Sequence, residues 1–148
     1  MRIAVGSDHA GFAAKQKIIS YLTELGHDIT DYGTFTDDSC DYPEFGSKAA
    51  RAVAQGICDK GVVICSTGIG ISISANKVKG IRCALCTNAF MAEMTRRHND
   101  ANMLAMGANV TPVDQMKEIV RIFLSTGFEG GRHQRRVDKI SMIENDRL

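Results

Sequence analysis

The segment Cys65-Ser66-Thr67-Gly68-Ile69-Gly70 carries the clearest chemical signal in the sequence. It follows a short β-branched run and precedes a helical stretch, so its backbone N–H groups should converge where a helix begins. Negative charge is favoured there, which suits a bound phosphate, a developing oxyanion or a thiolate on Cys65. The simpler interpretation is a packing turn with an inert cysteine. The segment matches neither the dinucleotide fingerprint nor the Walker loop, because it lacks their spaced glycines and Gly-Lys-Ser/Thr ending.

Three further segments place ionisable side chains where a site could form. Asp8 and His9 follow the first apolar run, and His98 lies at the end of a helical stretch. Histidine titrates near neutrality and is the usual residue for acid–base chemistry. Arg132 and Arg136 lie four apart after two glycines, so one helix face can present both to a phosphate. Taken alone, each feature also fits a turn aspartate, a surface histidine or a solvated charged face.

Short apolar runs alternate with helical periodicity along the chain. We expect strands at 3–5, 28–31, 61–65, 82–86 and 103–106, and helices at 12–25, 45–55, 71–79, 89–97, 113–124 and 132–145. The alternation predicts an α/β fold: a doubly wound, Rossmann-like three-layer sandwich with a five-stranded parallel sheet and an extending C-terminal helix. Ligands of such sheets bind beyond the carboxyl ends of the strands, which points to residues 6–11, 65–70 and 86–88.

Length and composition fit one domain over residues 1–148. Lys and Arg total 18 against 17 Asp and Glu, so the net charge of +1 gives no global attraction to nucleic acid or an anionic membrane. No apolar stretch approaches the roughly 20 residues of a membrane span, and the early charges do not fit a signal peptide. Five cysteines without framework spacing indicate free thiols in a reducing compartment, so we expect a cytoplasmic protein.

A C-x-x-C pair, Cys83 and Cys86, falls on an expected strand. Their odd separation points the two side chains to opposite faces of the sheet. No other cysteine or histidine pair has zinc spacing, so we expect no metal site.

Taken together, these segments resemble the type B ribose-5-phosphate isomerases, within the family that also holds galactose-6-phosphate isomerase subunits and allose-6-phosphate isomerase. The matching stretches follow the family's order through nearly the whole chain, at 6–11, 41–43, 65–72, 75–77, 98–102 and 129–133. The resemblance implies an aldose–ketose isomerase acting on a sugar phosphate without a cofactor, because the reaction is proton transfer only. It also implies a homodimer or homotetramer with shared active sites, in which the neighbouring subunit supplies the segment around His98 and Asn99.

The resemblance further assigns roles to single residues. Cys65 would be the base that moves a proton between C1 and C2 through a cis-enediolate. The amides that would stabilise its oxyanion belong to Ser66, Thr67, Gly68, Ile69 and Gly70. Thr67 and His98 would assist ring opening, and Asp8 would hold a sugar hydroxyl. The residues that would hold the phosphate are His9, Arg132 and Arg136, and those that would line the sugar are Tyr42 and Asn99.

Two positions depart from the family's pattern. Ser66 stands where many relatives have glycine, a change that retains the backbone N–H. Asn109 stands where several relatives carry a phosphate-binding arginine, and losing that contact would cost roughly 1.5–3 kcal/mol of binding. Cys65 argues against the galactose-6-phosphate subunits, which lack this cysteine in one partner.

Three hypotheses follow. The leading one is interconversion of D-ribose 5-phosphate and D-ribulose 5-phosphate, with Asn109 among the substrate-binding residues. The second is isomerisation of a six-carbon sugar phosphate such as D-allose 6-phosphate, motivated by the missing arginine. The third is a non-catalytic phosphate- or nucleotide-binding module of flavodoxin type, which leaves the cysteine, the histidines and the paired arginines unexplained.

Overall fold

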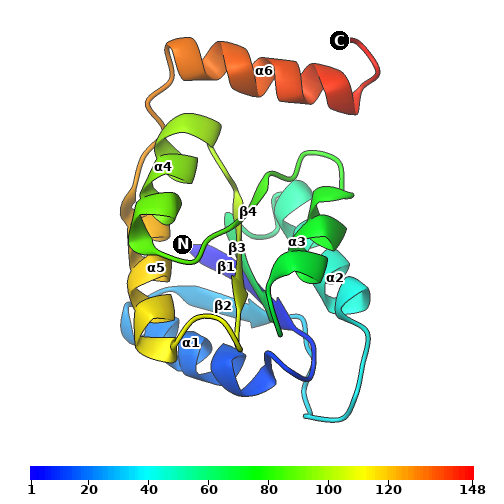
Figure 1. The fold of residues 1–148 in the computed structure, drawn as a ribbon, viewed down its shortest axis with the longest axis vertical. Coiled ribbons are helices and arrows are strands. Elements are labelled where there is room, and N and C mark those ends of the chain that lie inside the picture. The colour runs from blue at the N-terminus through cyan, green and yellow to red at the C-terminus, as the bar shows by residue number, and fades with distance from the viewer.

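The computed structural model describes residues 1–148 and contains a five-stranded parallel sheet covered by helices on both faces (Figure 1). The strands are β1 (Arg2–Ser7), β2 (Asp28–Asp31), β3 (Lys60–Cys65), β4 (Cys83–Leu85) and β5 (Met103–Gly107). Their order across the sheet is β2-β1-β3-β5-β4, and every neighbouring pair is parallel. The central strands are buried apolar runs, as parallel strands covered on both faces require. The predicted fold class is confirmed.

Five helices form the two outer layers of the sandwich. Their bounds are α1 (Phe12–Glu24), α2 (Tyr42–Ala54), α3 (Ile69–Asn76), α4 (Ala89–Asn99) and α5 (Val113–Ser125). One core lies between the sheet and α1, α4 and α5, and the second lies between the sheet and α2 and α3. Alternate residues of β3 supply both cores, since Val62 faces the first and Val63 the second. None of the helices is long and apolar enough to span a membrane.

The last helix, α6 (Arg132–Glu144), stands apart from the sheet and packs against α4 (Figure 1). Only His133 and Val137 of this helix are buried. Apolar side chains farther along it remain open to solvent, with Ile140 44% and Ile143 60% exposed. The expected extending C-terminal helix is therefore present, and part of its apolar surface has no partner within the chain.

Two predicted helix bounds differ from the observed ones by three residues. Helix α2 begins at Tyr42 rather than at 45, because Pro43 occupies the first turn, where its missing N–H costs nothing. Helix α3 ends at Asn76 rather than at 79, because the side-chain amide of Asn76 pairs with the backbone of Cys83. Both of those hydrogen bonds are 2.8 Å long, and they cover part of the exposed edge of β4.

Candidate active site

Cys65 ends β3 at the carboxyl edge of the sheet, and its side chain is directed at the loop that starts α3. The residue is 4% exposed, and its Sγ accepts a hydrogen bond of 3.1 Å from the amide of Gly68. Gly68 caps α3 in the left-handed conformation, with φ of 79°. A Cβ at this position would lie 2.5 Å from the Leu85 side chain and 2.8 Å from the Met106 backbone. The glycine therefore permits both the turn and its close approach to β5.

Ser66 and Asn109, the two residues that depart from the family's pattern, contact each other. The Asn109 side-chain amide donates to Ser66 Oγ at 2.8 Å, and the Asn109 backbone amide donates to the Ser66 carbonyl at 2.9 Å. Cys65 lies opposite Gly107 in the register of β3 and β5. The hydrogen bonds between Ser66 and Asn109 therefore continue the contact between these strands beyond the end of the sheet. The hydroxyl of Ser66 thus gives Asn109 a partner that glycine would not provide.

Asp8 and His9 lie at the end of β1, next to β3 in the sheet. Asp8 is 5% exposed, and its Oδ1 accepts a 3.0 Å hydrogen bond from the Gly11 amide, which fixes the turn. His9 Nδ1 lies 3.2 Å from both the amide nitrogen and the carbonyl oxygen of Cys40, so the backbone at residue 40 orients the ring. A carboxylate and an imidazole are therefore held at the edge of the sheet that carries Cys65.

The loop from residue 32 to 41, which brings Cys40 to His9, is anchored by a buried lysine. Lys15 has no exposed surface, and its Nζ donates to both carboxylate oxygens of Asp31, at 2.6 and 2.7 Å. The same ammonium donates to the Thr34 carbonyl at 2.6 Å. This anchor ties α1 to the loop.

Tyr42 and Thr67 complete this edge. The exposed Tyr42 ring lies over Gly70, where an added Cβ would come within 2.5 Å of it. Thr67 Oγ1 accepts a 3.3 Å hydrogen bond from the Ile69 amide and is itself exposed. The predicted site residues gathered at the carboxyl edge are therefore Asp8, His9, Tyr42, Cys65, Ser66, Thr67, Gly68, Ile69, Gly70 and Asn109.

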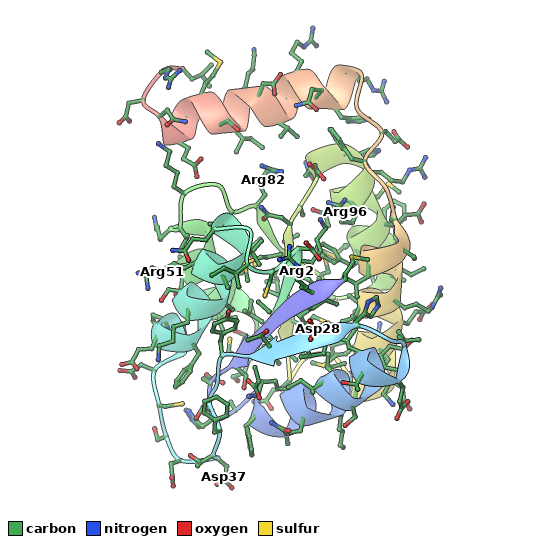
Figure 2. The ribbon with its side chains drawn as sticks, turned by 180° about the vertical axis from the view of Figure 1, so that it is seen from behind. Arg2, Asp28, Asp37, Arg51, Arg82 and Arg96 are labelled. Atoms are coloured by element: carbon green, nitrogen blue, oxygen red, sulfur yellow. The ribbon has the colours of Figure 1, made fainter.

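The remaining predicted site residues lie at the opposite, amino edge. They are His98, Asn99, Arg132 and Arg136. Helix α4 begins just after β4 and ends just before β5, and its 11 residues rise about 16 Å. Arg82, immediately before β4, donates to the Asn99 carbonyl at 3.0 Å and so ties this end of α4 to the amino edge. Figure 2 shows the separation, with Arg82 beneath α6 and Asp37 at the far tip of the loop after β2.

At that amino edge, His98 and His133 stack with ring centroids 4.2 Å apart and an interplanar angle of 9°. Glu129 Oε2 lies 3.4 Å from His133 Nε2 and 4.0 Å from His98 Nε2. Burial lowers the pKa of His133, and the nearby His98 and Arg132 lower it further. No chemistry was predicted for Glu129 or His133, because the fold alone brings them to His98 across more than 30 residues.

Cys83 and Cys86 belong neither to the site residues at the carboxyl edge nor to those at the amino edge. Cys83 packs against the core under α2 and α3, and Cys86 belongs to the core under α1, α4 and α5, which confirms the predicted opposite orientations. Burial raises the pKa of each thiol to about 12, so neither is suited to act as a base.

Fold and site together define a doubly wound α/β protein in which an amide-lined loop beside a thiol can accept an anionic substrate. Sequence comparison identifies the family. Residues 3–140 match the family described as Ribose/Galactose Isomerase, and the chain belongs to that family. It is 46% identical over 146 residues to ribose-5-phosphate isomerase B of Escherichia coli, covering 99% of this chain and 98% of that protein. Galactose-6-phosphate isomerase subunit LacB of Clostridium acetobutylicum is 39% identical over 149 residues, covering 99% and 86%.

Solved structures agree with this assignment. Ribose-5-phosphate isomerase B of Clostridium thermocellum is 51% identical and superposes over 100% of both chains with a TM-score of 0.98. The Mycoplasma genitalium enzyme, solved with bound ribulose 5-phosphate, is 37% identical, with a TM-score of 0.94 and coverage of 98% of this chain and 97% of that one. The protein is thus an aldose–ketose isomerase of the type B ribose-5-phosphate isomerase group.

Proposed function

We propose that residues 1–148 form one isomerase domain that interconverts D-ribose 5-phosphate and D-ribulose 5-phosphate, with Cys65 as the base. The observation that carries the proposal is the Cys65 thiol, held 3.1 Å from the Gly68 amide at the mouth of the anion-binding loop. The E. coli and C. thermocellum relatives bear the name of this activity and are 46% and 51% identical to the chain.

In the proposed reaction, the Cys65 thiolate removes the proton from C2 of the open-chain aldose and a proton is delivered to C1. The Gly68 amide stabilises negative charge on the sulfur before the reaction begins. Negative charge then develops on the oxygen of the cis-enediolate, close to the start of α3. Backbone amides there have no acceptor within their own helix; the Gly70 amide can donate to that oxygen directly, whereas the Ile69 amide must first leave Thr67 Oγ1.

The other site residues bind and open the sugar. The orientation of His9 by Cys40 suits it to hold a phosphate together with Arg132 and Arg136, whose side chains are exposed on α6. Asp8 holds a hydroxyl, while Tyr42 lines the sugar. Thr67 and His98 exchange protons with the ring oxygen and the anomeric hydroxyl.

We propose that each active site is shared between subunits of a homodimer or homotetramer. Cys65 and His98 lie at opposite edges of one chain, so one chain cannot bring both to a single sugar. A groove of about 520 Å³ beside α6 supports this proposal, because it is lined by apolar residues that include Ile81, Ile140 and Ile143. A second subunit seated there would cover the exposed face of α6 and bring His98, Asn99, Arg132 and Arg136 to the partner's cysteine.

The six-carbon alternative is not favoured, because relatives across nearly the whole chain are named for the five-carbon substrate. Asn109 is compatible with this, since its side chain is already held by Ser66 Oγ at 2.8 Å and extends the loop that carries the amides. We also propose a cytoplasmic location, which the five free cysteines support.

The test of the reaction is turnover of ribose 5-phosphate by the wild type, by Cys65→Ala and by the matched control Cys58→Ala. Cys58 is equally buried, at 2% exposure, but belongs to the core under α2 and α3. We expect Cys65→Ala to lose turnover while remaining folded, and Cys58→Ala to retain it. Turnover by folded Cys65→Ala would remove the thiol from the mechanism, and a strong preference for allose 6-phosphate would overturn the substrate.

Site sharing is tested by co-expressing Cys65→Ala and His98→Asn. Each variant alone should be inactive, but a hybrid dimer holds one intact site of two. With random pairing half of the dimers are hybrids, so about a quarter of wild-type turnover should return. Activity no greater than the sum of the two separate variants would show that the sites are not shared.

A further inference from the structure

Three side chains that can ligate a metal converge where α4 meets the start of α6. The ligating atoms of His98, Glu129 and His133 all lie within 4.8 Å of one another. Glu129 directs Oε2 toward both imidazoles, 3.4 Å from His133 Nε2 and 4.0 Å from His98 Nε2. His133 is nearly buried, whereas the side chains of His98 and Glu129 are 38% and 37% exposed. The cluster is therefore accessible from solvent on one side.

The two distances to Glu129 approach those of a tetrahedral zinc site, but the stacked His98 and His133 rings, 9° from parallel, must tilt before both nitrogen lone pairs can meet one ion. Zinc binds imidazole nitrogen and carboxylate oxygen at about 2.0–2.2 Å, which places neighbouring ligand atoms roughly 3.3–3.6 Å apart. The Glu129–His133 pair already has this separation, and the Glu129–His98 pair must shorten by about 0.5 Å. Two histidines and one carboxylate leave a fourth position for water, the arrangement of open zinc sites.

The surroundings hold Glu129 in place for this role. Arg97 binds the other carboxylate oxygen, Oε1, and the Glu129 amide donates to the Arg97 carbonyl at 3.1 Å. Glu93 pairs with the same arginine at 2.9 Å and offsets part of its positive charge. Hydrogen-bond partners of this kind orient metal ligands.

The turn before α6 has the same effect on His133. Gly130 and Gly131 have φ values of 67° and 54°, and a Cβ on either would meet no atom within 4 Å. Glycine is therefore needed here for backbone conformation rather than for space. The turn sets His133 beside Glu129, four residues earlier.

We propose that His98, Glu129 and His133 form a binding site for a zinc-class divalent cation, and that occupancy of this site inhibits the enzyme. Metal binding rests on the cluster alone, whereas inhibition rests on the function proposed above, in which His98 exchanges protons during ring opening. A metal on His98 Nε2 takes the lone pair that accepts a proton. The cation acts as an inhibitor and takes no part in the isomerisation.

The binding test is titration of the full-length protein with Co²⁺ as a spectroscopic substitute for Zn²⁺. The proteins compared are the wild type, Glu129→Gln, His133→Gln and the control His27→Gln. His27 lies near the N-terminal amine, away from the cluster. We expect one Co²⁺ per chain with visible bands of nitrogen and oxygen ligation. Affinity should fall at least roughly 10–100-fold in Glu129→Gln and His133→Gln and stay unchanged in His27→Gln.

The same titration can overturn the proposal. A thiolate-to-cobalt charge-transfer band would place the metal on a cysteine, and equal affinity in the wild type and folded Glu129→Gln would exclude the cluster. Because Glu129 is exposed, this variant keeps the test valid if His133→Gln fails to fold.

Inhibition is measured separately, as turnover in chelator-buffered Zn²⁺. Wild-type turnover should fall as the site fills and return with excess chelator, while Glu129→Gln retains its own turnover at the same free Zn²⁺. Filling of the site without loss of turnover would disprove inhibition. Absence of isomerase activity in metal-free wild type would instead disprove the proposed function and leave the Co²⁺ result standing.

Discussion

Gly68→Ala separates two effects of the loop glycine, its backbone conformation and its closeness to β5. The wild-type φ of 79° costs an L-residue about 1–2 kcal/mol. The new methyl group would also lie 2.5 Å from Leu85 Cδ1 and 2.8 Å from the Met106 carbonyl carbon, and relief of that overlap costs about 1–3 kcal/mol. The free energy of unfolding should therefore fall by about 2–5 kcal/mol.

Gly26→Ala is the matched control. Gly26 has φ of 81°, and an added Cβ would meet no atom within 4 Å, so it incurs only the conformational cost of about 1–2 kcal/mol. Urea unfolding of both variants and the wild type gives the comparison. Equal losses of stability in the two variants would refute the argument from close packing.

Turnover provides the second measurement on the same proteins. A shifted loop moves the Gly68 amide away from Cys65 Sγ and displaces the amides proposed to bind the enediolate oxygen. Loss of one such donor lowers kcat by roughly 10²–10³, whereas Gly26→Ala should leave kcat unchanged. Wild-type kcat in folded Gly68→Ala would show that the loop amides are not part of the chemistry.

Three further predictions concern other parts of the chain. Lys15→Met leaves Asp31 without its buried partner, so the free energy of unfolding measured in urea should fall by about 3–5 kcal/mol. A fall of less than about 1 kcal/mol would show that this ion pair does not stabilise the fold as argued. Hydrogen bonds from Arg2 lower the pKa of Asp59 to about 2, so the carboxylate stabilises the fold above its unfolded pKa near 3.9, and this stabilisation is lost as pH falls toward 2. The difference in unfolding free energy between wild type and Asp59→Asn should thus narrow from pH 5 to pH 2.5, and a constant difference would refute the linkage. Burial raises the pKa of Cys86 to about 12, which leaves about one thiol in 10⁴ ionised at pH 8. Mass spectrometry should therefore show that iodoacetamide alkylates Cys86 only after the protein unfolds. Alkylation of folded protein at the rate of a free thiol would contradict this.

Periodicity was sufficient to predict most of the elements. The buried β-branched run 61–65 is nearly the whole of β3, and the predicted helix 113–124 is α5 without its last residue. Misplaced bounds occurred where single side chains decide. Pro43 indicates a loop when it is read as a helix breaker, yet it fits the first turn of α2. The end of α3 depends on Asn76 bonding to Cys83, a contact that helical periodicity does not encode.

The candidate site could be predicted only where it is local in sequence. The loop from Cys65 to Gly70 is continuous, and residue types alone suggest an anion site. The stacking of His98 on His133 depends instead on the path of the chain between α4 and α6. The contact between Ser66 and Asn109 likewise follows from the pairing of β3 with β5. Sequence spacing contains neither piece of information, although both contacts change how the residues should be interpreted.

The strand order has a consequence for synthesis on the ribosome. β5 lies between β3 and β4 but is translated after both, so β4 has no neighbouring strand and β3 has only β1 until Gly107 has emerged. Between Cys65 and Gly107, a nascent chain lengthening at 5–20 residues per second spends roughly 2–8 s with one edge of β3 unpaired. An unpaired apolar strand can associate with other chains. The interval before β5 is complete is therefore when the growing polypeptide most needs chaperone protection.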